Sequence, residues 1–110
     1  MTDAAQFKSI KLTGRLDTTR VGEIETGFYA EVGFIKDPSV VALIDLGEVT
    51  FLSSLGIRLL VTAGKTFQQR QIRFGLIAPQ SSEVTEALEI SGITGLFRIF
   101  ENEEEARQGF

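Results

Sequence analysis

The chain contains 110 residues, 43% of them apolar and 24% charged, and carries a formal net charge of −4. This length and composition predict one globular domain over residues 1–110 with a single hydrophobic core. The acidic balance argues against nucleic-acid binding, which needs a basic surface. Cys and His are absent, which excludes disulfides, thiolate catalysis and every His-dependent triad or metal site.

No run of residues approaches the roughly 18 apolar positions that a membrane span needs. Residues 1–6 lack the basic flank and apolar stretch of a secretory signal. We therefore expect a cytoplasmic protein that does not insert into a membrane. We also expect it to use no cofactor and no metal, and not to be an enzyme.

The first part of the chain predicts a strand followed by a helix. Residues 7–13 alternate loosely between apolar and polar, which predicts a strand ending at Gly14. Apolar residues recur at helical spacing over residues 21–33. The candidate N-caps of this helix are Asp17, Thr18 and Thr19. Gly22 and Gly27 weaken the helix by up to about 1 kcal/mol each, and small residues inside a helix are also typical of close packing.

The rest of the chain repeats the alternation. Residues 40–46 form a continuous apolar run typical of a strand buried on both faces, and a short turn leads from it to a helix over residues 54–69. A strand is expected at residues 72–77, then a helix that starts at Ser81 or Ser82 and stops at residues 91–92. Residues 96–100 predict a last short strand, and residues 101–108 a polar helical tail.

Strands that alternate with helices at this spacing predict an α/β layered domain. We expect a mostly four- to five-stranded mixed sheet packed by about four helices. Right-handed crossovers would place the helices against the faces of the sheet.

Two adjacent serines, Ser53 and Ser54, open the helix over residues 54–69. A hydroxyl at a helix start lies near unpaired backbone N–H groups and the positive end of the helix dipole. It can cap the helix, and a phosphate there would meet a favourable field. One serine could cap while its neighbour is modified, so the residue types leave both functions open.

The helix that follows has two distinct stripes. One is apolar and suited to packing on the sheet: Leu55, Leu59, Ala63 and Phe67. The other contains Ser54, Arg58, Val61 and Lys65. Arg58 lies one turn from Ser54, within reach of a phosphate, and Lys65 extends a basic side complementary to an acidic partner.

Three short motifs resemble a known family. Gly14-Arg15-Leu16-Asp17 resembles its Gly-x-Leu-Asp signature, and Ser91-Gly92-Ile93 its recurrent Ser-Gly-Leu. Between them, the apolar strand and residues 45–57 resemble its Asp-Ser-Ser-Gly-Leu site. The family is the STAS domain, the fold of anti-sigma factor antagonists and of the cytoplasmic module of sulfate transporters, and the resemblance extends from about Ser9 to the C-terminus.

The resemblance implies a partner-switching mechanism. An unmodified antagonist docks on an anti-sigma factor that is an ATP-dependent serine kinase, and the sigma factor is released. The kinase phosphorylates the first serine of the motif, here Ser54, until a serine phosphatase restores docking. Together with the exposed stripe of the helix over residues 54–69, we expect the partner-binding residues to be Gly14, Asp17, Ser53, Ser54, Leu55, Gly56, Arg58 and Val61.

The chain departs from the family motif at two positions. Ser53 replaces the aspartate, which removes a carboxylate beside the acceptor and offers a second candidate hydroxyl. Leu55 replaces the second serine and adds apolar surface, directed either into the core or towards a partner.

Other readings remain open. The chain could be a constitutive scaffold or transporter-associated subunit in which Ser54 only caps, and an apolar patch around Leu55 and Val61 would allow a homodimer. A hydrolase or transferase with Ser54 as nucleophile lacks a base. We interpret Asp17 as a cap, and Asp45 and Glu48 as residues of the strand exit, in preference to a metal site.

Overall fold

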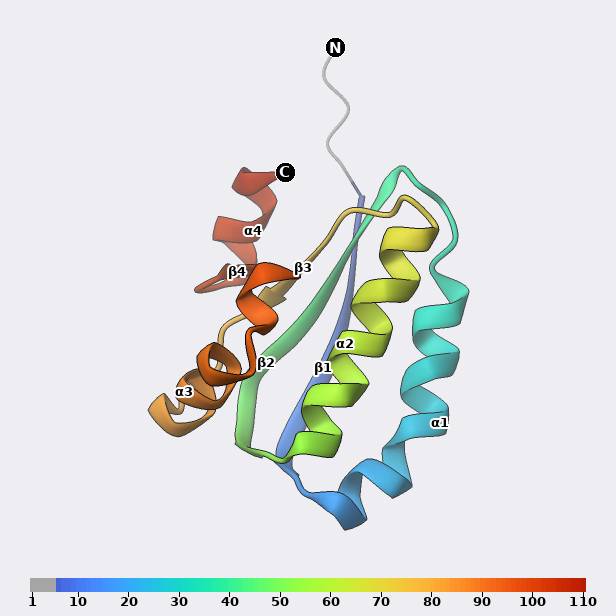
Figure 1. Cartoon of the computed structure of the whole chain (residues 1–110). Coiled ribbons are helices and arrows are strands. Elements are labelled where there is room, and N and C mark those ends of the chain that lie inside the picture. The colour runs from blue at the N-terminus through green and yellow to red at the C-terminus, as the bar shows by residue number, and fades with distance from the viewer. Residues whose placement is uncertain (1–5) are drawn as a thin grey trace.

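The computed structural model describes residues 6–110, so the N-terminal stretch on which no secretory signal is expected lies almost entirely outside the described residues. Its elements alternate along the chain as expected (Figure 1). They are β1 (Gln6–Leu16), α1 (Thr18–Phe34), β2 (Val40–Leu52), α2 (Ser54–Gln69), β3 (Phe74–Ile77), α3 (Ser82–Ser91), the 3-10 turn η1 (Ile93–Gly95), β4 (Arg98–Phe100) and α4 (Glu103–Gly109).

The four described strands form one sheet in the order β1-β2-β3-β4. This confirms the predicted α/β fold class. The sheet departs from the expected mixed one, because its three pairings are all parallel. Since each strand neighbours the next one in sequence and crossovers share one hand, α1, α2 and α3 all cover the same face. Figure 1 shows these three helices in front of the sheet and α4 behind it.

Each face of the sheet has its own apolar cluster. The larger one lies under α1, α2 and α3 and includes Leu16, Leu46 and Phe67, all fully buried. The smaller one lies on the other face, where Phe100 and Ala106 pack against residues of β2 and β3. The run of residues 41–44 is buried throughout, as expected for a strand that is covered on both faces.

The turn expected after residue 46 is not a turn. Strand β2 continues to Leu52, and its pairing with β1 shifts register twice, each time with one additional residue on β2. These are β-bulges, and at the first one Gly47 donates its backbone N–H to Asp45 Oδ1 at 2.8 Å. Turn-type residues therefore kink the strand without ending it. Likewise β1 does not end at Gly14, which has a positive φ of 78°, but runs on to Leu16.

Helix starts follow the sequence closely. Among the candidate caps, Asp17 caps α1 and Ser81 caps α3, each accepting a backbone N–H from three residues onward. Within residues 6–110, none of the helices has the length and apolar character to cross a membrane.

Candidate functional site

Ser53 is the N-cap of α2. Its Oγ accepts the backbone N–H of Gly56 at 3.2 Å and donates to the Leu16 carbonyl at 2.7 Å. The same carbonyl accepts the backbone N–H of Ser53 at 3.0 Å. The half-buried hydroxyl thus fastens the start of α2 to the end of β1.

Ser54 stands in a different environment, although it is the next residue. It is the first residue of α2 and is exposed. Within residues 6–110 its side chain takes part in no hydrogen bond. The first turn of α2 contains no acidic residue, so the helix dipole favours added negative charge at this position. The sequence left two functions open for two serines, and the structure gives the capping function to Ser53.

The starts of α1 and α2 lie side by side at the carboxyl ends of β1 and β2. Leu16 pairs with Leu52 at the end of the β1–β2 ladder. Asp17 follows directly and caps α1 by accepting the Arg20 N–H at 2.9 Å. The predicted site residues of these two segments, far apart in sequence, therefore share one edge of the sheet.

A groove of about 440 Å³ runs between α1 and α2 from this edge. From α2 it is lined by Leu55, Arg58, Leu59 and Thr62, and from α1 by Thr18, Val21, Gly22, Glu25 and Tyr29. Leu55 is 37% exposed, whereas the other three residues of its predicted stripe are buried. Leu55 therefore faces the groove and leaves the sheet contact to the rest of the stripe.

The remaining predicted residues separate into exposed and buried ones. Arg58 and Lys65 are exposed, and Val61 is half-buried against the main core. Gly56 is buried: a Cβ on it would lie 2.7 Å from Leu52 Cδ1 and 3.3 Å from the Leu16 carbonyl oxygen. Gly56 thus permits the close approach of α2 to β1 and offers no side-chain surface to a partner.

The three acidic residues that the sequence singled out each have a structural role, whereas Glu25 lines the groove and forms no ion pair within residues 6–110. Asp17 is a cap, Asp45 holds the bulge at Gly47, and Glu48 forms an ion pair with Lys11. This pair, chiefly its hydrogen bond, raises the pKa of Lys11 above its ordinary value. Within the described part of the chain, no three acidic side chains gather as metal ligands would.

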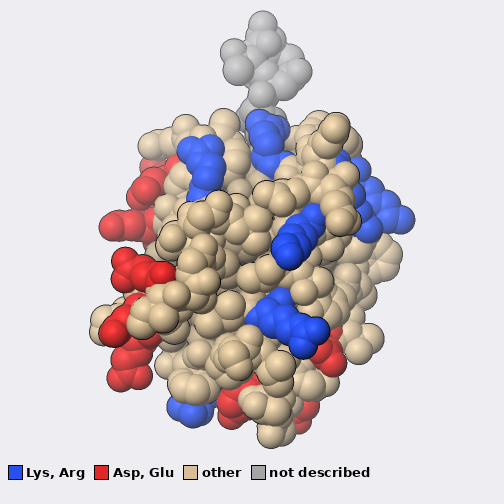
Figure 2. All heavy atoms as spheres, in the orientation of Figure 1, with Lys and Arg blue, Asp and Glu red and all other residues tan. Residues whose placement is uncertain are grey.

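Charge is distributed unevenly around the molecule. Figure 2 shows Lys and Arg side chains over the front, where α2 lies, and Asp and Glu side chains along the border formed by α3 and α4. Helix α2 contains Arg58 and Lys65 and no acidic residue. The exposed side of α2 is thus cationic, although Glu25 of α1 lines the groove with Arg58 and Figure 2 shows further acidic side chains along the lower edge of this face.

Sequence reasoning missed the contribution of α1 to this groove. The available signal was Gly22, for which the sequence left close packing open as one alternative. The structure excludes that alternative, because a Cβ built on Gly22 or on Gly27 meets nothing within 4 Å. Each glycine keeps a surface hollow open, and Gly22 lines the groove beside Leu55 and Arg58.

Comparison with known proteins agrees with this architecture. The STAS domain model matches residues 3–106. An anti-sigma-factor antagonist (STAS) domain protein from Planctomyces limnophilus is 30% identical, with a TM-score of 0.75 over 86% of this chain and 79% of that chain. No curated protein matches the chain in sequence.

Two more distant structures share the fold. The phosphorylated form of the Bacillus cell fate determinant SpoIIAA is 20% identical, with a TM-score of 0.65 over 99% of this chain and 95% of that chain. The SulP transporter STAS domain from Vibrio cholerae is 21% identical, with a TM-score of 0.72 over 98% and 83%. Because the family model covers nearly its whole length, this chain belongs to the STAS domain family.

Proposed function

We propose that this chain is an anti-sigma factor antagonist that binds an anti-sigma factor serine kinase and is released when Ser54 is phosphorylated. The observation that carries the proposal is that the two adjacent serines differ: Ser53 is hydrogen-bonded as the N-cap, and Ser54 is exposed. Ser53 holds the helix start, with its hydroxyl fully engaged. Ser54 is exposed beside a groove with an apolar and a cationic residue, so a kinase can reach it without unfolding the helix start.

The electrostatics of the site suit a switch. Phosphorylation adds about −1.5 to −2 charges at neutral pH. At Ser54 that charge meets the N-terminus of α2 and lies one turn from Arg58. The phosphate on Ser54 would attract the Arg58 guanidinium away from a bound partner, and it would add negative charge beside the groove. A loss of roughly 3 kcal/mol of docking energy lowers affinity more than a hundredfold.

The docking surface in this proposal is the groove between α1 and α2 together with the exposed side of α2. Leu55 supplies apolar contact, and Arg58 and Lys65 attract an acidic partner. Asp17 and Gly14 act mainly by positioning the start of α1 beside α2. A serine phosphatase would restore the docking form, and the cycle would take place in the cytoplasm.

The direct test is to incubate the protein with its cognate anti-sigma factor kinase and ATP, then map the added phosphate by mass spectrometry. We expect one phosphate on Ser54, none on a Ser54→Ala variant, and unchanged modification of Ser54 in a Ser82→Ala variant. Ser82 is the matched control, because it also is an exposed first helical residue behind a serine cap. Phosphate on Ser53 alone would overturn the assignment.

Docking is tested separately with charge variants. Ser54→Asp should lower kinase binding about tenfold or more in a calorimetric titration, while Ser82→Asp should leave binding unchanged. The likeness to a transporter STAS domain favours a second candidate, a constitutive scaffold or transporter-associated subunit that is not regulated by phosphorylation. Partner binding that Ser54→Asp leaves unchanged, with no phosphate acquired from the kinase, would select that second function.

A further inference from the structure

Helix α3 exposes a large apolar side chain in its last turn. Ile90 is 78% exposed, whereas Val84 and Leu88 of the same helix are buried in the main core. A single exposed apolar residue is ordinary on a protein surface. Ile90, however, lies where α3 runs into η1, and η1 leads on to Leu96, which is only half-buried. The exposed side chain therefore belongs to a longer segment, residues 90–97, that contains no charged residue.

This uncharged segment packs directly against α2. A Cβ built on Gly64 would lie 2.8 Å from Leu96 Cδ2, so the glycine lets the chain after η1 approach α2 closely. Ile57 and Val61 lie on the same side of α2 as Gly64, and both are half-buried against the main core. Ile57, Val61, Leu96 and Ile90 thus border the junction of α2, η1 and α3, and we call these four residues the apolar strip.

Charges of opposite sign flank the apolar strip. On α3, Glu83, Glu86 and Glu89 are all exposed, and the helix contains no Lys or Arg. Helical spacing places Glu86 on the same side of α3 as Ile90, one turn before it. On α2, Lys65 is exposed and the helix contains no acidic residue. Figure 2 shows an uncharged band across the middle of this face, between the acidic border over α3 and the Lys and Arg side chains over α2.

The charges of α3 and of Lys65 are not neutralised within residues 6–110, because neither of the two ion pairs found there involves α2 or α3. Arg58 differs from Lys65, since Glu25 lines the same groove as Arg58. Lys65 is therefore the cation that this face offers to a partner, and the glutamates of α3 are its anions.

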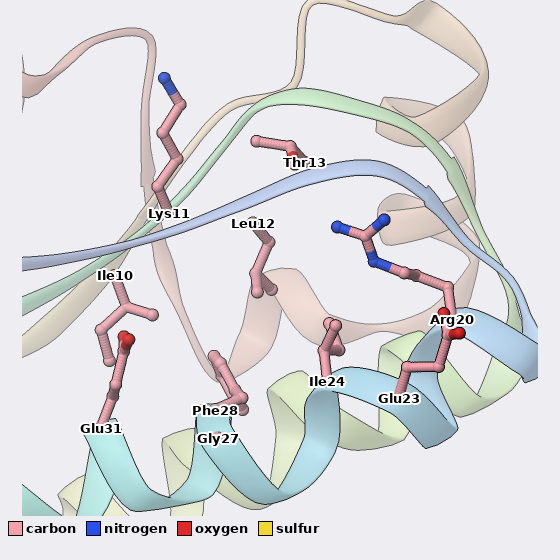
Figure 3. A pocket seen from close by; sticks show the side chains of 10 residues that line it. All are labelled: Ile10, Lys11, Leu12, Thr13, Arg20, Glu23, Ile24, Gly27, Phe28 and Glu31. Atoms are coloured by element: carbon pink, nitrogen blue, oxygen red, sulfur yellow. The ribbon is translucent and has the colours of Figure 1, made fainter.

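The groove between β1 and α1, of about 310 Å³, lacks such a division of charge. Figure 3 shows Arg20 and Glu23 of the same helix both bordering it. Ile10, Leu12 and Phe28 point into it from its two walls, but these side chains are buried in the main core. Opposite charges are mixed in that groove, so it presents no separate charged side to a partner.

We propose that the face formed by α2, η1 and α3 is the interface of a symmetric homodimer, in which α2 of one copy lies over α3 of the other. A two-fold axis along the apolar strip brings the two strips together. The same axis places Lys65 of each copy opposite the glutamates of α3 in the other copy. An isologous interface requires a patch that is complementary to itself in this way, and this face supplies both signs of charge as well as the apolar centre.

The proposed dimer does not depend on the phosphorylation of Ser54. Lys65 also belongs to the docking surface proposed for the kinase, so a dimer and a kinase complex would exclude one another. Experiments on the dimer therefore use the unmodified chain without kinase or ATP, and their outcome is separate from that of the phosphorylation test.

Sedimentation velocity of the unmodified chain should show a monomer–dimer equilibrium at concentrations up to about 1 mM. Ile90→Ser should raise the dissociation constant of the dimer at least about tenfold, because it removes apolar area from the centre of the interface. A chain that stays monomeric at all these concentrations, or a dimer that Ile90→Ser leaves unchanged, would refute the proposal.

Phe34→Ser is the matched control for Ile90→Ser. Phe34 is 81% exposed at the end of α1, which lies on the other side of α2 from α3 (Figure 1). Both side chains lie largely in solvent, so both variants should fold, and circular dichroism checks this. We expect Phe34→Ser to leave the dissociation constant unchanged, and an equal weakening by the two variants would place the interface elsewhere.

Charge reversal tests the two-fold arrangement itself. Lys65→Glu and Glu86→Lys should each weaken the dimer at least about tenfold, because like charges then face each other twice across the interface. An equal mixture of the two variants should form a heterodimer, since every unlike pair is then restored, and the chain with both substitutions should dimerise by itself. Single variants that dimerise as well as the unchanged chain, or a mixture that stays monomeric, would overturn the proposal.

Discussion

Replacing each of the adjacent serines in turn should separate the cap from the free hydroxyl. Ser53→Ala removes an N-cap acceptor, which contributes about 1 kcal/mol, and a hydroxyl donor to the Leu16 carbonyl, which contributes about 0.5–1.5 kcal/mol. The carbonyl keeps its bond from the backbone N–H of Ser53, so it is not orphaned. We therefore expect a total loss of about 1.5–2.5 kcal/mol in the free energy of unfolding.

Ser54→Ala should change the free energy of unfolding by less than about 0.5 kcal/mol, because the Ser54 side chain is exposed and forms no hydrogen bond within residues 6–110. Urea denaturation followed by circular dichroism measures both variants, and thermal melts should show Ser53→Ala lower by about 4–12 °C. An equal loss in the two variants, or a larger loss in Ser54→Ala, would show that the division of work between the serines is wrong.

Three further predictions concern the surroundings of the site. Gly56→Ala should lose about 1–3 kcal/mol in the same denaturation assay, because its Cβ would lie 2.7 Å from Leu52 Cδ1; an unchanged midpoint would contradict the close approach of α2 and β1. Arg70→Ala should lose about 1–2 kcal/mol and expose the end of α1 to hydrogen exchange, since one Arg70 nitrogen donates to three carbonyls there, at 3.0, 3.2 and 3.4 Å. Arg70→Lys should recover part of that loss, and exchange at the end of α1 that stays slow in Arg70→Ala would disprove the clamp. The backbone and hydroxyl of Ser39 lower the pKa of Asp37, so the stability it contributes is present above its ordinary pKa and is lost as pH falls through the lowered one; carbon-detected NMR titration of Ser39→Ala should show that pKa move upward.

The sequence predicted the fold from local information. The strand–helix alternation, the buried run of residues 41–44 and the caps Asp17 and Ser81 all follow from neighbouring residues, because periodicity and capping are short-range effects. The sequence predicts a turn where β2 has its first bulge, since Asp45 and Gly47 favour either structure. Only pairing with β1 along the whole strand distinguishes a kinked strand from one that ends.

The candidate site residues stay predictions, and their arrangement could not be obtained from the sequence. The motif located Ser53 and Ser54, and helical spacing located Arg58. Both serines have the same hydroxyl, however, and the capping geometry depends on the Leu16 carbonyl, 37 residues away. Leu55 faces the groove and Gly56 faces the core, because packing against β1 and α1 fixes the rotation of α2 about its axis. Residue types determined which chemistry is available, and contacts between segments distant in sequence decided which side chain is free to use it.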